Sequence, residues 1–191
     1  TCFAKEPSPA ITEQKNVAVP MRDGVILRAD IFRPADDSAG PYPVLMGRTP
    51  YNKNGMHKDA RRFAAAGYIV VCQDARGRYA SDGQWESFLR FDTHNARDGY
   101  DTVEWCAKLP ESTGKVGAVG FCWGGGMANR LAAAGTSLNA CVPYYGRQIP
   151  VEDVPKISAP LLLQYAGLDE RINAGIPDSE AALKAHYKPY E

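Results

Sequence analysis

The segment KVGAVGFCWGGG, residues 115–126, constrains the fold more than any other part of the 191-residue chain. A short apolar run predicts a buried strand over 116–120, and a run of small residues predicts a helix over 124–134. Cys122 lies in the sharp turn between them. Such a turn requires very small residues two positions before and two positions after the nucleophile, and both positions are glycine here. A side chain there lies near the positive end of the next helix, which favours a thiolate and a developing oxyanion. We therefore predict that Cys122 is a nucleophile.

Two other interpretations of this segment stay open. A glycine-rich helix N-terminus beside a buried cysteine would have the same pattern. A dinucleotide-binding loop needs Gly-x-Gly-x-x-Gly after the first strand of its fold, and here several predicted strands come before the turn.

The remaining sequence alternates between strands and helices from position 44 onward, which predicts an α/β fold with a mainly parallel sheet. The predicted strands cover 44–47, 68–72, 116–120, 140–144 and 161–165. The predicted helices cover 58–66, 95–109, 124–134 and 179–186. Upstream, two strands on either side of the turn Arg22-Asp23-Gly24, over 16–20 and 25–32, predict an antiparallel hairpin. We expect a single domain over 1–191, with a loose lead-in over 1–15.

Composition excludes several classes of function. The 22 Lys and Arg residues balance 22 Asp and Glu residues, so no net charge points to nucleic acid. No apolar run approaches the ~20 residues of a membrane span. Five cysteines without a Cys-x-x-Cys pair do not indicate a disulfide framework, and three scattered histidines indicate neither a metal nor another cofactor. The sequence does not settle the compartment: it slightly favours a cytoplasmic location, and a processed leader before Thr1 is the alternative.

A candidate acid follows the apolar run over 161–165, which ends in Gly-Leu-Asp169. An acid in the loop after a later strand can hold a catalytic histidine in the right tautomer. Asp169 could equally be a solvated turn residue or a helix N-cap. Only His186 follows it, at the end of a predicted helix where histidine is common, so the expected base is missing.

These residues resemble two related families. From about 114 to 191 the chain is similar to dienelactone hydrolase, through Gly-Lys-Val-Gly (114–117), Gly-Phe-Cys-Trp-Gly-Gly (120–125), Tyr-Tyr-Gly (144–146), Pro-Leu-Leu (160–162) and Gly-Leu-Asp (167–169). From about 19 to 105 it resembles the cocaine esterase and X-prolyl dipeptidyl peptidase group. The motifs there are MRDG (21–24), ADIFRP (29–34), RTPYNK (48–53), QDARGR (73–78), SDG (81–83) and DGYDTVEW (98–105). Both resemblances imply an α/β-hydrolase fold, a mainly parallel sheet flanked by helices.

The first resemblance implies that Cys122 is the nucleophile and Asp169 the triad acid. In that family the histidine follows the acid by roughly thirty residues, which here falls just past Glu191. We therefore expect the fold to be truncated before its last strand and helix. A sheet edge exposed in this way predicts self-association.

The second resemblance implies that Tyr51 donates its hydroxyl to the oxyanion, beside the backbone N–H of Trp123. Pro50 has no N–H to offer, which agrees with a side-chain donor. A packing aromatic is the alternative for Tyr51. Arg78 matches an arginine of dienelactone hydrolase that binds the substrate carboxylate, although its surroundings also fit a loop anchor. Thr49 replaces a glutamate that dienelactone hydrolase ties to its thiol, so that activation scheme is not carried over.

The function that follows is hydrolysis of a carboxylic ester or lactone through a thioacyl intermediate on Cys122. Two alternatives stay open. One is an X-prolyl peptidase or acyl esterase, although those enzymes use serine. The other is an inactive fragment or pseudo-enzyme, which the missing histidine favours.

Overall fold

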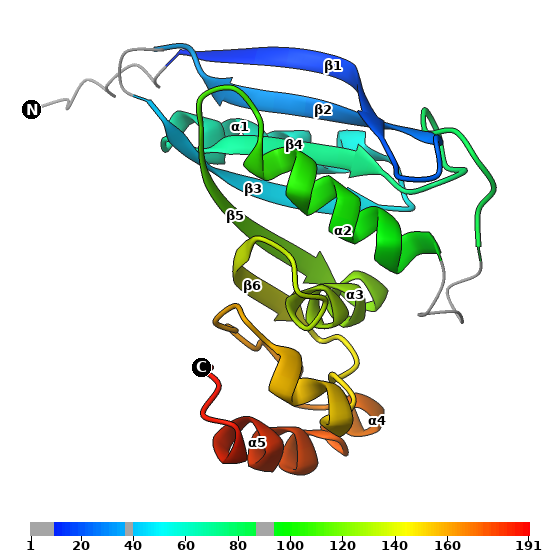
Figure 1. The fold of residues 1–191 in the computed structure, drawn as a ribbon, viewed down its shortest axis with the longest axis vertical. Coiled ribbons are helices and arrows are strands. Elements are labelled where there is room, and N and C mark those ends of the chain that lie inside the picture. The colour runs from blue at the N-terminus through cyan, green and yellow to red at the C-terminus, as the bar shows by residue number, and fades with distance from the viewer. Residues whose placement is uncertain (1–9, 37–39, 87–93) are drawn as a thin grey trace, which may run out of the picture.

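The computed structural model describes residues 10–36, 40–86 and 94–191. Its centre is a six-stranded sheet in the order β1-β2-β4-β3-β5-β6 (Figure 1). The strands are β1 (Ile11–Pro20), β2 (Ile26–Pro34), β3 (Tyr42–Thr49), β4 (Ile69–Asp74), β5 (Ser112–Phe121) and β6 (Leu138–Tyr144). The α-helices are α1 (His57–Ala65), α2 (His94–Ala107), α3 (Trp123–Ala132), α4 (Glu170–Asn173) and α5 (Ile176–Ala185). The described residues also form the 3₁₀ helices η2 (Lys53–Met56) and η3 (Val151–Lys156).

The middle of the sheet is parallel, as the alternating pattern predicted. Strand β3 pairs in parallel with β4 on one side and with β5 on the other, and β5 pairs in parallel with β6. All six residues of β4 are buried, as expected of a strand that is covered on both faces. The predicted hairpin is confirmed as well, because β1 and β2 are antiparallel and β2 joins β4 antiparallel.

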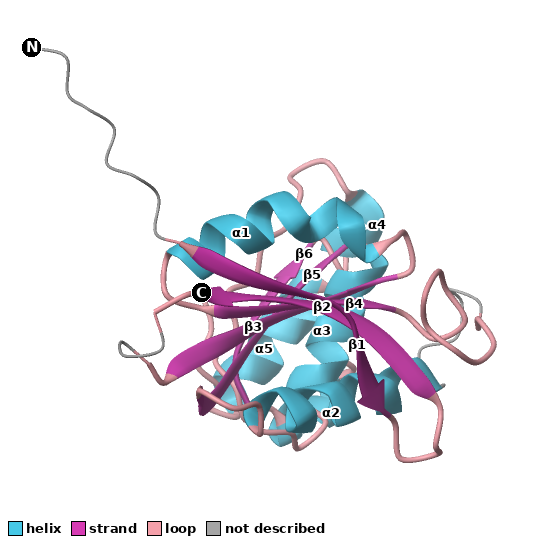
Figure 2. Cartoon of the chain, turned by 90° about the horizontal axis from the view of Figure 1, so that it is seen from above, coloured by secondary structure: helices cyan, strands magenta, loops and turns pink. Residues whose placement is uncertain are grey.

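Helices cover both faces of this sheet. Helix α1 packs on β2 and β4, while α2 and α3 pack on the opposite face and contact each other. Figure 2 shows α1 and α2 on opposite sides of the strands. Side chains of β4 alternate between the two layers: Val71 joins the large core beneath α2 and α3, whereas Val70 and Cys72 join the smaller core beneath α1.

The lead-in expected over 1–15 is wrong in its second part, because β1 already begins at Ile11. Residues 12–16 are exposed in the structure and polar in the sequence. An edge strand of this kind lacks the apolar alternation that identifies a half-buried strand. Residues 1–9 lie outside the described part of the chain.

The strand predicted over 161–165 is also corrected. The segment pairs with the backbone of β6 through two isolated parallel bridges, Cys141 to Leu161 and Tyr144 to Gln164. Its other side bonds to residues 189–191, including Leu163 N to the Glu191 carbonyl at 2.7 Å. The segment is therefore held beside the sheet without forming a regular strand. The short helix α4, just after it, was not predicted.

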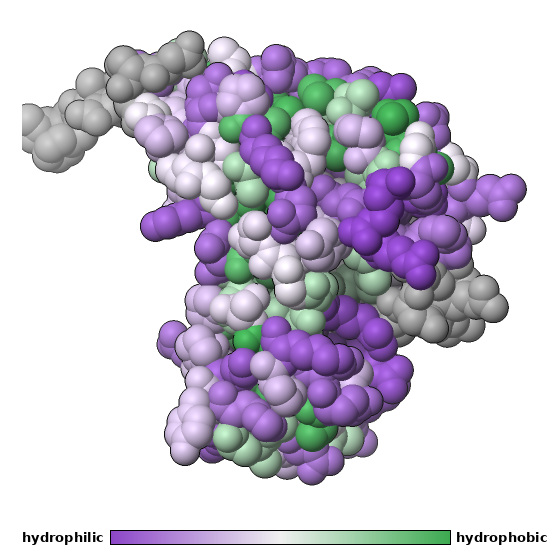
Figure 3. Space-filling model, viewed as in Figure 1, coloured by the Kyte–Doolittle hydropathy of each residue, from purple (hydrophilic) through white to green (hydrophobic). Residues whose placement is uncertain are grey.

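The surface shown in Figure 3 is mostly hydrophilic, with smaller hydrophobic areas between the polar ones. Among the described residues, no helix has both the length and the apolar character to cross a membrane. Self-association stays a prediction, which measuring the size of the protein in solution tests.

Candidate active site

The carboxyl ends of β3, β4 and β5 lie at one edge of the sheet because these strands are parallel neighbours. Tyr51 follows β3, Arg78 follows β4 and Cys122 follows β5. From β3 the chain continues outward to β4, and from β5 it continues outward on the other side to β6. The direction in which successive strands are added to the sheet therefore reverses between β3 and β5. Ligands of open α/β sheets bind at such a switch point, outside the carboxyl ends of the strands. Tyr51 and Cys122 follow the two strands that border it.

Cys122 occupies a strained backbone conformation, as the sequence predicted for the turn. Its φ is 56° and its ψ is −120°, a combination that costs about 1–3 kcal/mol for a residue other than glycine. Two hydrogen bonds hold the turn: the N–H of Cys122 donates to the Tyr144 carbonyl at 3.0 Å, and the N–H of Gly126 donates to the Cys122 carbonyl at 3.2 Å. Cys122 is exposed, whereas Cys72, Cys106 and Cys141 are buried.

The requirement for small neighbours is confirmed at Gly120 and wrong at Gly124. A Cβ added at Gly120 would lie 2.0 Å from the Gly124 carbonyl oxygen, while a Cβ at Gly124 would meet nothing within 4 Å. The second tight position is one residue later, because a Cβ at Gly125 would lie 2.5 Å from the Tyr144 carbonyl oxygen. The turn therefore packs closely against its own helix and the end of β6.

Tyr51 and Trp123 lie at the two sides of the switch point. Tyr51 is 69% exposed, and its N–H donates to the hydroxyl oxygen of Thr49 at 3.1 Å. A side chain this exposed does not fit the packing role that the sequence left open for Tyr51. Trp123 is the first residue of α3, where backbone N–H groups point toward the N-terminal end of the helix.

Arg78 serves as a loop anchor through one of its nitrogens. Its Nε donates to the Pro50 carbonyl at 2.9 Å, directly before Tyr51. Its guanidinium lies 5.7 Å from the centre of the Trp85 ring, and Trp85 packs edge-on against Trp123 at 6.0 Å. These contacts connect the loops after β3 and β4 with the start of α3.

Asp169 caps α4, since its side chain accepts a hydrogen bond from the Ile172 N–H at 3.1 Å. This is the helix-capping role considered from the sequence. Among the described residues, no histidine contacts Asp169: His57 lies 2.8 Å from Asp30, His94 lies 3.7 Å from Asp23, and His186 ends α5 in an exposed position.

A buried network of charges near this edge was missed from the sequence. Arg76 bonds to Asp98 at 2.6 and 3.0 Å and to Asp23 at 2.9 Å. The bond to Asp98 holds the pKa of Arg76 above its usual value. Lys53 pairs with Asp74 at 2.9 Å. The available signal was the run Gln-Asp-Ala-Arg (73–76), in which three polar residues come directly after the apolar run predicted as a strand over 68–72.

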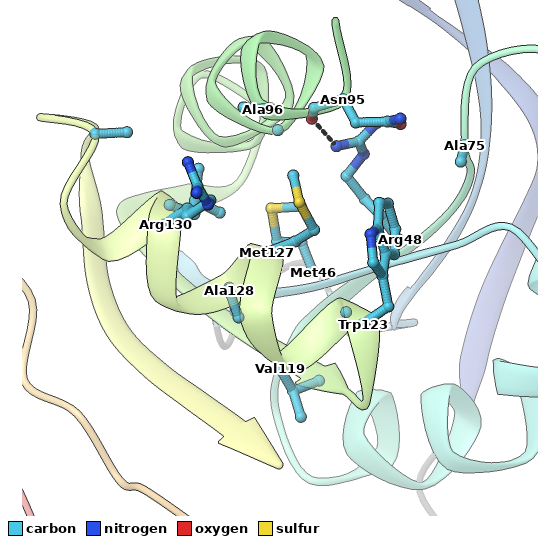
Figure 4. A pocket seen from close by; sticks show the side chains of 15 residues that line it. Met46, Arg48, Ala75, Asn95, Ala96, Val119, Trp123, Met127, Ala128 and Arg130 are labelled. Atoms are coloured by element: carbon cyan, nitrogen blue, oxygen red, sulfur yellow. Dashed lines mark hydrogen bonds between the residues drawn. The ribbon is translucent and has the colours of Figure 1, made fainter. Parts of the chain in front are cut away.

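A small cavity of about 60 Å³ lies behind the turn, between α2, α3 and the sheet. Figure 4 shows Met46 and Met127 in it beside Arg48, whose Nη1 donates to the Asn95 carbonyl at 2.8 Å. Burial lowers the pKa of Arg48. Trp123 also lines the cavity. The cavity therefore borders the turn on its inner side.

A mainly parallel sheet with helices on both faces, and a strained turn from strand to helix at its switch point, define an α/β hydrolase. A solved structure described as a putative dienelactone hydrolase from Klebsiella pneumoniae has the same fold, with a TM-score of 0.77 and 23% identity over 95% of this chain and 84% of that one. The sequence model of the X-Pro dipeptidyl-peptidase (S15) family matches residues 23–153. The chain belongs to this family.

Sequence relatives come from both groups that the motifs resemble. Cocaine esterase from a Rhodococcus strain is 36% identical over 135 residues, which are 67% of this chain and 22% of the esterase. A putative carboxymethylenebutenolidase, another name for dienelactone hydrolase, from Saccharolobus solfataricus is 41% identical over 78 residues, 40% of this chain and 30% of the relative. The chain thus spans less than a third of each of these two relatives.

Proposed function

We propose that this chain hydrolyses a carboxylic ester or lactone with Cys122 as its nucleophile. The sulfur attacks the carbonyl carbon, a C–S bond forms, the C–O bond to the alcohol breaks, and the alcohol leaves with a proton. Water then attacks the thioester, which releases the carboxylic acid and restores the thiol. The observation that carries the proposal is the strained conformation of an exposed cysteine at the switch point of the sheet, with φ of 56°.

The oxyanion formed during this attack needs hydrogen-bond donors. We assign that role to the backbone N–H of Trp123 and the hydroxyl of Tyr51, which follow β5 and β3. Pro50 has no N–H, so the loop after β3 offers a side chain instead. Removing one donor of this kind typically slows a reaction about 10²–10³-fold.

Asp169 and Arg78 have supporting roles in the proposal. Asp169 follows the segment that bonds to β6, so it belongs to the same edge as Cys122 and is the proposed triad acid. Arg78 has its Nε on the Pro50 carbonyl, and its terminal nitrogens are the groups we assign to a substrate carboxylate. The base is the imidazole that Asp169 would orient, which the described histidines do not supply.

The test uses p-nitrophenyl acetate and the purified chain. We expect a burst of p-nitrophenol together with a mass gain of one acetyl group on the peptide that contains Cys122. Imidazole added to the buffer should speed the second step, because it replaces the missing base. A chain that gains no acetyl group, or a Cys122→Ala variant that reacts as fast as the parent, would refute the proposal.

A second candidate is cleavage of X-prolyl peptides, because the matching family model describes that activity. The discriminating substrate is Ala-Pro-p-nitroanilide. Release of p-nitroaniline that depends on Cys122 would favour the peptidase over the esterase, provided that simple esters react more slowly.

A further inference from the structure

Tyr51 carries the proposed hydroxyl donor on a side chain that is 69% exposed, so the backbone that bears it contributes to where the hydroxyl lies. The residues on either side of Tyr51 fix that backbone. On the far side, Asn52 has a φ of 85°, in the left-handed region, and its side chain accepts from the Asn54 N–H at 3.0 Å. This unusual conformation needs an anchor further along the chain.

Lys53 provides that anchor. Its backbone N–H donates to one carboxylate oxygen of Asp74 at 2.8 Å, and its ammonium donates to the other at 2.9 Å. The same ammonium donates to the Asn16 side chain at 2.9 Å and lies 3.8 Å from Asp30. Lys53 is 5% exposed and Asp74 is fully buried, so one carboxylate fixes both the backbone and the side chain of the residue two positions after Tyr51.

Asp74 also connects this loop to the one after β4. It is the last residue of β4, and its carboxylate lies 3.4 Å from the Ala80 N–H. From that second loop, Arg78 donates to the Pro50 carbonyl at 2.9 Å. Tyr51 is therefore held from both sides, through Pro50 before it and through Lys53 after it.

A buried ion pair is weak evidence for stability, because the desolvation of two charges offsets much of their attraction. The double contact of Asp74 to the backbone and the side chain of Lys53 is better explained by a requirement for fixed geometry. A shift of about 1 Å in a reacting group can cost 10²-fold in rate.

We propose that the Lys53–Asp74 pair positions Tyr51 for catalysis, by fixing the backbone that carries the oxyanion donor. The pair acts through Tyr51 and does not touch the substrate. This inference rests on the proposed function, in which the Tyr51 hydroxyl stabilises the oxyanion.

The test is a double-mutant cycle that measures the rate constant of Cys122 acetylation by p-nitrophenyl acetate, at saturating ester and at half saturation. We expect Tyr51→Phe to lower the saturating rate constant about 10²-fold. Lys53→Met should lower it about 10-fold or more, with the half-saturating concentration changed less than about threefold, because the pair positions a group that acts in the transition state. In the Tyr51→Phe background, Lys53→Met should lower it less than about threefold, because the two residues then act as a unit.

The control is Arg33→Met, which removes the 2.9 Å ion pair to Glu111, next to the start of β3 and far from the switch point. It should leave the acetylation rate unchanged. If Lys53→Met does not fold, Lys53→Met with Asp74→Leu removes both charges and leaves no buried carboxylate unpaired. Thermal unfolding of every variant checks that the native fold is present.

The outcomes separate the two proposals. Equal losses from Lys53→Met in both backgrounds, or no loss in a folded variant, overturn the positioning role while the effect of Tyr51→Phe leaves the proposed function standing. No effect of Tyr51→Phe, or no acetylation of the parent chain, overturns the proposed donor or nucleophile, and the positioning role with it.

Discussion

The geometry of the turn at Cys122 predicts that alanine at Gly120 and alanine at Gly124 have different effects on stability. A methyl group added at Gly120 would lie 2.0 Å from the carbonyl oxygen and 2.4 Å from the carbonyl carbon of Gly124, and 2.9 Å from the Gly125 nitrogen. All three are backbone atoms, so no side chain can rotate away, and the start of α3 must move by about 1 Å to reach even the shortest tolerated contact. Overpacking of this kind costs about 1–3 kcal/mol, and we expect Gly120→Ala to be at the upper end because backbone must shift.

The assay is reversible urea unfolding, supported by thermal unfolding. A loss of about 3 kcal/mol corresponds to a Tm lower by roughly 6–12 °C in a domain of this size. Gly124→Ala is the matched control, since its methyl group meets nothing within 4 Å and the position lies in α3. Alanine is the better helix former by up to about 1 kcal/mol, so this variant should equal or exceed the parent in stability. A Gly120→Ala variant within about 0.5 kcal/mol of the parent, the range of neutral surface changes, would refute the reasoning.

Three further predictions test burial and charge. Iodoacetamide on the native protein should label Cys122 far faster than the described cysteines that are buried. Burial raises the pKa of two of these, Cys72 and Cys141, to about 12. Equal labelling without denaturant would contradict this prediction. Arg76→Met removes both hydrogen bonds to the buried carboxylate of Asp98 and leaves it only the longer ion pair with Arg48 at 3.7 Å, so it should cost about 3 kcal/mol in urea unfolding, whereas a loss under about 1 kcal/mol would contradict a buried pair. Burial pushes the pKa of Asp101 up, but hydrogen bonds from Arg22 outweigh it and hold that pKa below its usual value. The resulting stabilisation is present above the unfolded pKa of about 3.9 and is lost as the pH falls through the lower folded pKa, so Arg22→Gln should cost stability at pH 7 and less near pH 3; an equal cost at both pH values would contradict it.

The predictable parts of the fold are those in which a local run of apolar or small residues indicates burial. The β-branched run that became β4 is buried at every position, and the small-residue helix after Cys122 begins one residue earlier than predicted. The first half of β1 could not be predicted, because an exposed edge strand needs no apolar alternation. The run over 161–165 misled in the opposite direction: its leucines are apolar, yet its backbone bonds are divided between β6 and residues 189–191.

The features of the candidate site also differ in whether the local sequence could predict them. The strain at Cys122 was predictable because its causes lie within five residues of it. The tight contact at Gly125 was not, because it is made with Tyr144, at the end of a different strand. The Lys53–Asp74 pair joins residues after one strand and at the end of its neighbour, so it depends on the pairing of β3 with β4. A local pattern identifies a strained turn, but a contact across strands requires the order of the sheet.

That order also brings together residues that were proposed from two different resemblances. The esterase-like motif that contains Tyr51 spans the end of β3, and the motifs similar to dienelactone hydrolase begin in β5. If β5 paired outside β4, the loop with Tyr51 would be separated from Cys122 by a whole strand. Because β5 pairs with β3, the loop after β3 and the turn after β5 are neighbours. The oxyanion donor proposed from one resemblance and the nucleophile proposed from the other therefore belong to adjacent strands, which is the geometry that a shared reaction requires.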